Sequence, residues 1–442
     1  MNRGPQAAGV DSRLARLYAR TRAGIRPGLE SIRRVLAAMG NPEKSFLVVH
    51  VAGTNGKGST CAMIESILRA HGLRTGLYTS PHLVHFHERI QVAGKPVTDA
   101  ELERLLSLAD AADVRGAKES GDRECTFFEL ATAMAFQHFA DAGVQVAVVE
   151  VGMGGRWDAT NTVQPVVTVI TPVALDHMEY LGTDFASIVG EKAGILKSGA
   201  RAVCSAQDPE ARVIIEEQAR RLAVNVRWAD AHVRVSGRNV TPGGQTFEME
   251  TDTARYGRVT LPLSGPHQVG NAATAVLAVE AFFEALGREA DPDILKMGLA
   301  ATRWPGRCQM VEDDPPVIVD GAHNPAGATV LAAALAEMFP GRKGAFVISA
   351  LADKDFPGIL TALRGRIGAA WAVMLAGERA RSAADLKSSL AAAGIRAEVL
   401  PLAEAIAAAR QQARADGSFV CVTGSLFLIG DALALLGRDP LP

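Results

Sequence analysis

The chain has 442 residues, of which 48% are hydrophobic, so it is long enough for two domains, or three, each with its own core. The formal net charge is −2, which gives no global basic field to attract nucleic acid. No segment approaches the roughly 20 apolar residues that a membrane-spanning helix needs. The N-terminal stretch also lacks the apolar core of a secretory signal. These observations favour an enzyme of the cytoplasm with no nucleic-acid or membrane partner.

The cysteines support the same compartment. They are odd in number, scattered and never in a C-x-x-C pair, which argues against a disulfide framework or a zinc site and fits reduced thiols. They are Cys61, Cys125, Cys204, Cys308 and Cys421.

In chain order, apolar runs alternate with helical patterns. A buried strand is expected at 46–53, followed by a helix over 57–70 and by further buried strands at 145–152 and 166–171. The same pattern returns late in the chain at 315–322, 344–350 and 418–425. Continuous apolar strands separated by helices predict α/β architecture, with mostly parallel sheets covered on both faces.

The middle of the chain differs. Residues 226–263 alternate apolar and polar residues around glycine turns, which predicts a small antiparallel appendage of the first domain. A helix is expected over about 267–286, and 302–316 is interpreted as a linker. We therefore predict an N-terminal α/β domain over 1–302 with a P-loop-type sheet, and a smaller Rossmann-like α/β domain over 303–442.

The stretch VAGTNGKGST, residues 51–60, resembles a phosphate-binding loop but departs from the pattern G-x-x-x-x-G-K-[ST]. Gly53 and Gly56 let the backbone turn tightly and bring N–H groups to an anion, and the helix that follows adds its dipole. Lys57 would reach the β- and γ-phosphates, and Ser59 and Thr60 would bind phosphate oxygen or Mg²⁺. The alternative is a strand–helix turn with a solvated lysine.

Two side chains follow buried strands, where open α/β sheets bind ligands. Glu150 is a candidate Mg²⁺ ligand, and the glycines around it allow a ligand close to the backbone; the alternative is a capping carboxylate. His177 is expected at the same sheet edge as Lys57 and Glu150, which favours a ligand or an orienting group, although a lone histidine is more often structural.

Lys192 lies in IVGEKAGILKSGA, residues 188–200. From the residues alone, a lysine on a solvated helix face is the favoured interpretation. The alternative is a desolvated, neutral amine that adds CO₂ and becomes a carbamate, an anion able to help hold a cation.

In the second domain, VIVDGAHNPAG (317–327) places Asp320 and His323 after an apolar strand. An aspartate there would bind a ribose hydroxyl, or form an Asx turn or cap. Arg307 in the predicted linker would clamp phosphate, or lie on the surface.

These stretches, in this order, resemble the folylpolyglutamate synthase/dihydrofolate synthase family of the Mur ligase superfamily. The matches run from residue 50 to 430 and comprise HVAGTNGKGST, YTSPHLVHFHERI, TFFELATAMAF, VEVGMGGRWDATN, ALDHMEYLG, EKAGILK, HQVGNAATA, RWPGR, VDGAHNPAG, ISALADKD and VTGSLFLIG. G-T-N-G-K-G-S is this family's own phosphate loop. The resemblance implies a monomer that binds ATP between two domains, whose closure assembles the site.

The resemblance also implies a reaction. ATP phosphorylates a carboxylate of a pterin-bearing acid, dihydropteroate or a reduced folate, and the amino group of L-glutamate attacks the acyl phosphate. The products are an amide, ADP and phosphate. Phosphorylation is needed because a carboxylate is a poor electrophile, and the γ-phosphate must be neutralised and aligned.

Carried over residue by residue, the resemblance implies three sets. The implied catalytic residues are Lys57, His177 and Lys192. One Mg²⁺ is held by Ser80 and Glu150, and a second by His177 and carbamylated Lys192. The nucleotide is held by Thr54, Asn55, Gly56, Lys57, Gly58, Ser59, Thr60, Asn271, Arg307, Asp320 and His323.

The pterin side would be lined by Thr126, Phe127, Phe128, Glu129, Trp157, Asp158 and Ala159. Aromatic rings there would stack on a flat heterocycle, although Phe127 and Phe128 are also candidates for helix core.

The chain departs from the family in GIRPGLE (24–30), where Arg26 and Pro27 replace an Asp-Leu-Gly-like turn that helps bind dihydropteroate, so the pterin substrate stays open. The spacing of His82, His85 and His87 also permits a zinc site, although no cysteine or acidic cage surrounds it and a loop over the substrate explains it as well. Two rival functions remain. The first is a peptidoglycan-type Mur ligase, which would need a separate N-terminal domain, and too little chain precedes the phosphate loop to form one. The second is a non-catalytic nucleotide-binding protein.

Overall fold

The computed structural model describes residues 13–20, 28–241 and 243–440, and these form two compact units. The first contains the described residues up to His82, Phe86–Val233 and Ala272–Gly298; the second contains Leu83–His85, Arg234–Asn271 and the described residues from Leu299 onward. The sequence placed the antiparallel appendage in the first domain, whereas Arg234–Asn271 is grouped with the second unit. Arg26 and Pro27 lie outside the described residues.

The first unit contains an eight-stranded sheet in the order β4-β3-β2-β5-β1-β6-β7-β8. Its strands are β1 (Leu47–Ala52), β2 (Thr75–Tyr78), β3 (Ile90–Val92), β4 (Lys95–Pro96), β5 (Val146–Glu150), β6 (Val167–Ile170), β7 (Arg201–Cys204) and β8 (Val226–Trp228). All neighbouring strands are parallel except β3 against β2 and β4 against β3. The three buried strands predicted here are confirmed.

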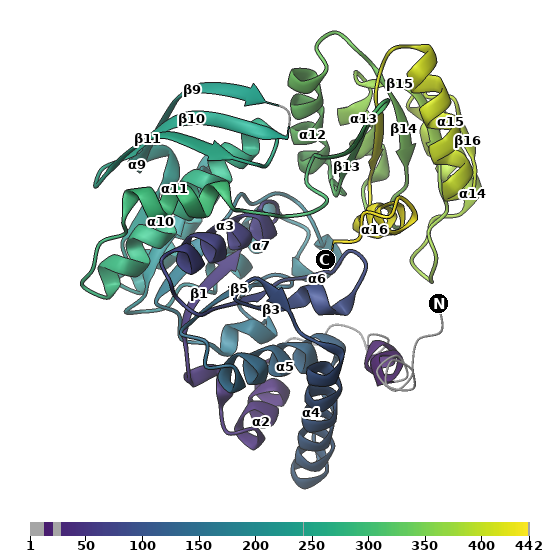
Figure 1. Ribbon diagram of the computed structural model, residues 1–442. Helices are drawn as coiled ribbons and strands as arrows, with labels where there is room; N and C mark the ends of the chain where they lie inside the picture. The colour runs from purple at the N-terminus through teal and green to yellow at the C-terminus, as the bar shows by residue number, and fades with distance from the viewer. Residues whose placement is uncertain (1–12, 21–27, 242, 441–442) are drawn as a thin grey trace. The chain divides into compact units, whose positions relative to one another are not determined.

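Helices cover both faces of this sheet, which is why its central strands are apolar along their whole length. Figure 1 shows α2 (Glu30–Ala38), α4 (Asp99–Ser120) and α5 (Phe127–Asp141) on one side of it and α3 (Lys57–Ala70) on the other. Beyond β6, α7 (Phe185–Ala193) and α8 (Pro209–Arg221) share one apolar cluster. Further helices of this part of the chain are α6 (Met178–Leu181), α9 (Ala229–His232), α10 (Pro266–Ala285) and α11 (Pro292–Ala300).

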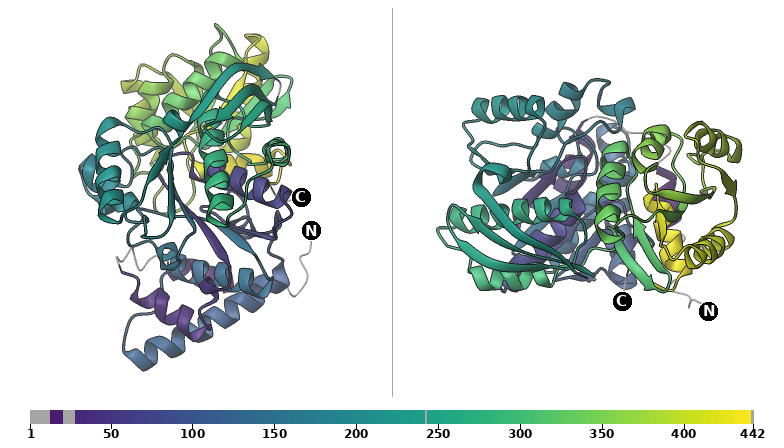
Figure 2. Two further views of the ribbon diagram at one scale, coloured as in Figure 1. Left: turned by 90° about the vertical axis from the view of Figure 1, so that its left-hand side faces the viewer. Right: turned by 90° about the horizontal axis from the view of Figure 1, so that it is seen from above.

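The predicted antiparallel segment forms a three-stranded sheet, in the order β11-β10-β9. Its strands are β9 (Val233–Thr241), β10 (Gly244–Thr251) and β11 (Arg255–Leu261). Figure 2 shows them side by side in teal. The prediction was wrong about its first residues, because β8 instead extends the parallel sheet of the first unit beside β7.

The C-terminal part of the second unit is a six-stranded sheet in the order β12-β13-β17-β14-β15-β16. The strands are β12 (Gln309–Asp313), β13 (Pro316–Asp320), β14 (Gly344–Ile348), β15 (Ile367–Ala372), β16 (Ala397–Val399) and β17 (Val420–Thr423). The predicted linker 302–316 is in part a strand, since β12 pairs antiparallel with β13 and finds there the hydrogen bonds that a linker would lack.

Two apolar clusters lie on the two faces of this sheet, as a doubly wound α/β fold requires. The first is built with α12 (Pro325–Met338), α13 (Phe356–Leu363) and α14 (Ala383–Ala392), and the second with α15 (Leu402–Ala415) and α16 (Leu426–Leu435). The Rossmann-like prediction for this region is confirmed.

Across the described ranges, no helix combines the length and the apolarity needed to cross a bilayer. The five cysteines are buried and unpaired.

Candidate active site

The candidate residues of the first unit meet at one edge of its sheet. The register pairs Val51 with Glu150, and Ala52 with Ile170, so the carboxyl ends of β1, β5 and β6 are level. The residues that follow these strands therefore share one edge, as sequence reasoning required.

The phosphate-type loop is held against the segment after β6. The amides of Thr54 and Asn55 donate to Pro172 O at 3.0 and 3.2 Å, and Thr54 Oγ1 donates to Ala174 O at 2.9 Å. Gly53 has φ +148°, and a Cβ there would lie 1.9 Å from Thr171 Oγ1. Only glycine fits this position, because both the conformation and the contact exclude a side chain.

Helix α3 begins directly after the loop. Gly56 is its left-handed N-cap (φ +85°), and Lys57 is its first residue, with Nζ donating to Thr54 O at 3.2 Å. Thr60 is fully buried, and its Oγ1 has no hydrogen-bond partner within the described residues. A helix N-terminus behind a left-handed glycine presents free N–H groups, which is the arrangement that binds anions.

Lys192 is buried, not solvated as the residues alone favoured. It lies on α7, is 4% exposed, and its Nζ donates to Gly53 O at 2.9 Å, which joins it to the phosphate-type loop. Burial, together with the neighbouring Lys57 charge, lowers its pKa to about 7, against the opposing effect of Asp176. The amine is therefore partly neutral near pH 7 and can act as a nucleophile.

Glu150 and Ser80 are hydrogen-bonded to each other at this edge of the sheet. Glu150 is 4% exposed at the end of β5, and its Oε2 accepts from the Ser80 amide at 3.1 Å. Among the described residues, no three His, Cys, Asp or Glu side chains gather as a metal cage. Mg²⁺ does not need one, because it uses one or two carboxylates and completes its shell with phosphate and water, so the Glu150 carboxylate fits it.

His177 follows β6 as the N-cap of α6, with φ +54°. Its Nε2 lies 3.8 Å from Asp176 Oδ2, and its side chain is partly exposed. Asp176, which sequence reasoning did not single out, raises the pKa of Lys192, so this carboxylate belongs to the surroundings of that amine.

Asp158, expected on the substrate side, is occupied structurally. Its Oδ1 accepts from the Thr160 amide at 3.0 Å and its Oδ2 from the Met153 amide at 2.9 Å, so it closes the loop after β5. Thr160 Oγ1 also contacts His50 Nε2 at 2.8 Å, and burial lowers the pKa of that imidazole to about 3. Ala159 is buried beside Asp158, and Trp157 is half-exposed.

The start of α5 carries the other expected substrate residues. Thr126 is its N-cap, and Thr126 and Glu129 form a capping box. Glu129 is also held by both terminal nitrogens of Arg123, at 2.8 and 2.9 Å. Both side chains therefore position the helix start.

The two phenylalanines at the start of α5 are partly buried against the core, and both have aromatic partners that the sequence did not reveal. Phe127 stacks on Tyr18, with ring centroids 5.3 Å apart, and Phe128 packs over Gly152, where a Cβ would lie 2.4 Å from its Cζ. Phe128 also packs on Tyr78, with ring centroids 6.0 Å apart, so both phenylalanines have an aromatic neighbour.

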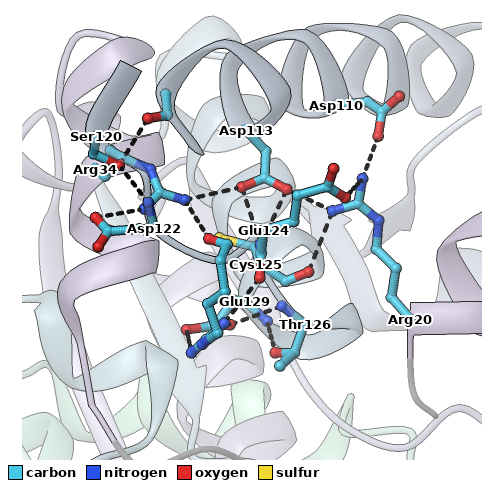
Figure 3. Close-up of polar contacts among 12 residues, drawn as sticks. Arg20, Arg34, Asp110, Asp113, Ser120, Asp122, Glu124, Cys125, Thr126 and Glu129 are labelled. Carbon is cyan, nitrogen blue, oxygen red and sulfur yellow. Dashed lines mark hydrogen bonds and ion pairs between the residues drawn. The ribbon is translucent and has the colours of Figure 1, made fainter. Parts of the chain in front are cut away.

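A buried ionic network holds this region together (Figure 3). The fully buried Asp113 of α4 accepts from the Cys125 amide at 3.0 Å and pairs with Arg20 at 2.5 Å and with Arg34 of α2 at 3.4 Å. Arg20 also pairs with Asp110 at 2.7 Å. The network therefore ties residues 13–20, which carry Tyr18, to the start of α5.

The three histidines of PHLVHFHER have three different partners. His82 Nδ1 accepts from Arg89 Nε at 2.8 Å, His85 Nε2 lies 2.7 Å from Asp439, and His87 Nε2 lies 2.9 Å from Asp99. These contacts do not support a shared zinc site.

In the second unit, Asp320 lies at the carboxyl end of β13, level with Thr423 of β17. Its Oδ1 accepts from the Ala322 amide and its Oδ2 from the Cys308 amide, both at 2.8 Å. Burial raises its pKa, against the Arg307 charge and these hydrogen bonds. The cap that was considered as the alternative is thus present, but each oxygen keeps a second lone pair for a ligand.

Arg307 and His323 flank Asp320. Arg307 Nη1 donates to Gly306 O at 3.0 Å and would lie 2.6 Å from a Cβ at Gly321, so it runs across that glycine. His323 Nδ1 lies 2.8 Å from Gly321 O. Asn271, also of this unit, donates to Gln268 Oε1 at 3.0 Å.

Comparison with known proteins identifies the two regions separately. Residues 51–279 match the Mur ligase middle domain, and residues 306–426 match the Mur ligase glutamate ligase domain. The dihydrofolate synthase/folylpolyglutamate synthase of Mycobacterium tuberculosis is 38% identical over 94% of this chain and 91% of its own length.

Solved structures agree. The Mycobacterium tuberculosis folylpolyglutamate synthase complexed with ADP has a TM-score of 0.93 at 37% identity, covering 98% of this chain and all of that one. An FPGS–AMPPCP–folate complex has a TM-score of 0.84 at 32% identity, covering 97% of this chain and 99% of that one. This confirms the resemblance drawn from the motifs: the chain belongs to the folylpolyglutamate synthase/dihydrofolate synthase family of the Mur ligases.

Proposed function

We propose that this protein is an ATP-dependent ligase of folate metabolism that joins L-glutamate to the carboxylate of dihydropteroate, of a reduced folate, or of both. The observation that carries the proposal is the meeting, at one sheet edge, of an anion-binding loop, the hydrogen-bonded pair Glu150–Ser80 and the buried amine of Lys192. The full-length similarity to a folylpolyglutamate synthase that binds ADP supports it.

The chemistry has two transfers. A carboxylate oxygen of the acid attacks the γ-phosphorus of ATP, the bond to the bridging oxygen breaks, and ADP leaves with the electron pair. The glutamate nitrogen then attacks the acyl carbon, the carbon–oxygen bond to phosphate breaks, and the nitrogen loses a proton to give the amide. The first transfer is slow unless negative charge on the phosphates is neutralised and the reactants are aligned.

The chain's own residues supply that alignment. The N–H groups at the start of α3 and the charge of Lys57 would hold the phosphates, with Thr54, Asn55, Gly56, Gly58, Ser59 and Thr60 around them. Glu150 and Ser80 would hold Mg²⁺, which neutralises phosphate charge when bound. In the second unit, Arg307, Asp320 and His323, with Asn271, are also proposed to contact nucleotide.

Lys192 is proposed to work as a carbamate. Its neutral amine attacks the carbon of CO₂ and loses a proton, which gives an anion at the loop. The reversal of charge turns the unfavourable neighbourhood of Lys57 into a favourable one. The carbamate and His177 would then hold a second Mg²⁺.

On the acid side, the Phe127 ring, with Trp157, would stack on the flat heterocycle, and Thr126, Glu129, Asp158 and Ala159 would fix the two loops that carry these rings. Phe128 would shape the floor over Gly152. We further propose a monomer of the cytoplasm, which size-exclusion chromatography and fractionation test.

The deciding experiment measures ADP release with Mg-ATP and L-glutamate, separately with dihydropteroate and with tetrahydrofolate, and identifies the glutamylated product by mass. Turnover with both acids assigns both activities; turnover with one assigns that step and directs attention to Arg26 and Pro27. ADP release only with a UDP-sugar acid would instead favour a peptidoglycan-type ligase. Nucleotide binding without turnover of any acid would favour a non-catalytic protein.

A further inference from the structure

Arg89, the partner of His82, is a buried cation of the first unit that lies beside Phe127. Arg89 is 7% exposed and directly precedes β3. Among the described residues its side chain makes one hydrogen bond, from Nε to His82 Nδ1 at 2.8 Å, and no ion pair. Its two terminal nitrogens thus have no acceptor there.

Other arginines of this unit are paired with carboxylates. Arg123 makes a two-nitrogen pair with Glu129, and Arg20 and Arg34 both pair with Asp113. A guanidinium taken from water without an anion carries a desolvation penalty, and burial indeed lowers the pKa of Arg89. An unpaired buried cation is therefore costly to stability, and a ligand anion would offset that cost.

The surroundings show which kind of anion fits. The guanidinium carbon lies 5.2 Å from the Phe127 ring centre and 5.8 Å from the Phe86 ring centre. Tyr18 stacks on Phe127. The planar fork of arginine matches the two oxygens of a carboxylate, while the rings match an aromatic body. A ligand with a flat ring system and a carboxylate satisfies both.

The sheet register places this group near the reacting end. The Thr79 amide donates to Arg89 O at 3.0 Å, and the neighbouring Tyr78 is paired with Val149, the residue before Glu150. Two strand spacings, roughly 10 Å, therefore separate the backbones of Arg89 and Glu150. This distance is within the span of one pterin-bearing acid.

We propose that the Arg89 guanidinium binds a carboxylate of the acid substrate, an assignment that rests on the proposed function. The carboxylate is either the one that is activated for ligation, which is the benzoate carboxylate of dihydropteroate and a glutamyl carboxylate of folate, or the second glutamyl carboxylate, which only folate carries. Arg89 is a binding residue in this assignment, and Tyr18, which stacks on Phe127, is proposed to line the same side of the site.

The test combines a protein change with a ligand change. Binding of dihydropteroate, of dihydrofolate and of their single carboxamide analogues is measured by calorimetry, without ATP, for the wild type, Arg89→Met and Arg89→Lys. Arg104→Met, which removes an exposed arginine of α4, is the matched control. Urea unfolding midpoints are measured for every variant.

We expect the wild type to prefer the acid over one carboxamide by about 10- to 100-fold, the range of a charge-assisted hydrogen bond, and Arg89→Met to lose that preference. Its unfolding midpoint should be unchanged or higher, because an unpaired buried charge is removed. Arg89→Lys should keep part of the preference for the acid. If Arg89→Met does not fold, the reduced preference of Arg89→Lys is the test. The carboxamide analogue that the wild type binds more weakly than the acid identifies the carboxylate that Arg89 contacts.

The proposal is overturned if Arg89→Met keeps the wild-type preference, or if it weakens acid and carboxamide equally, which is the mark of a merely structural residue. A wild type that binds neither acid and releases no ADP with either would refute the proposed function itself. A wild type that turns over the acids while Arg89→Met binds them normally would refute the Arg89 assignment alone.

Discussion

Replacing Lys192 with methionine should stabilise the protein and abolish its activity. In the folded chain the pKa of Lys192 is lowered to about 7 by burial, whereas an unfolded lysine titrates near its ordinary value of 10.5. Between these pH values the unfolded chain binds more protons, so stability rises with pH over that window. Below pH 7 the full cost of burying the amine is present.

The size of the effect follows from the two pKa values. The burial of Lys192 costs about 4 kcal/mol at pH 7 and about 2 kcal/mol at pH 9, if no other group changes. Methionine has a similar volume and no charge, so Lys192→Met should gain up to these amounts, and its advantage over the wild type should shrink as pH rises. Lys44→Met, at an exposed position, should show neither effect.

The assay is urea unfolding of CO₂-free protein between pH 6.5 and 9.5, with coupled ADP release measured in parallel. Addition of ¹³C-bicarbonate should give a carbamate signal in the wild type that Lys192→Met and Lys192→Ala lack, and both variants should be inactive but folded. A methionine variant no more stable than the wild type at pH 7, or with the same pH dependence, would show that Lys192 is not a desolvated amine. Near-normal turnover of Lys192→Ala would remove the carbamate from the mechanism.

Three further changes test other parts of the structure. Gly53→Ala should destabilise the first unit and weaken nucleotide binding, because the new Cβ would lie 1.9 Å from Thr171 Oγ1; Gly365→Ala, with open space around it, is the control, and circular dichroism with nucleotide titration measures both. Glu150→Gln should lower kcat about 100-fold or more while Mg²⁺-free ATP binding stays within about twofold, and an unchanged kcat would remove Glu150 from the metal site. Asp113→Asn should cost about 3 kcal/mol in urea unfolding, since it leaves two arginines without their shared buried anion, and a loss below about 1 kcal/mol would mean that the network in Figure 3 does not hold the start of α5.

Much of the fold could be predicted from short apolar runs. The strands β1, β5, β6, β13, β14 and β17 were expected because a strand buried on both faces is apolar at every position. β8 and β12 were missed for the complementary reason. Each is an edge strand, whose half-exposed residues look like those of a loop or a meander.

The candidate site divides in the same way. The glycines of the loop and the residues that directly follow buried strands could be found in the sequence, because parallel strands bring their carboxyl ends to one edge. Whether a carboxylate is free or occupied could not be found, and Asp158, Glu129 and Asp320 all hold backbone amides or an arginine.

The family, the α/β class and the phosphate-type loop could be predicted from the sequence alone, because these depend on local pattern and on motifs in fixed order. Only the tertiary structure decided the states of Lys192 and Arg89. The sequence favoured a solvated Lys192, and the fold buries it against Gly53 O. Nothing in FHERI distinguishes Arg89, which the fold places beside two rings with no anion paired to it among the described residues. The physical reason is that desolvation is a property of the neighbours, and these come from distant parts of the chain.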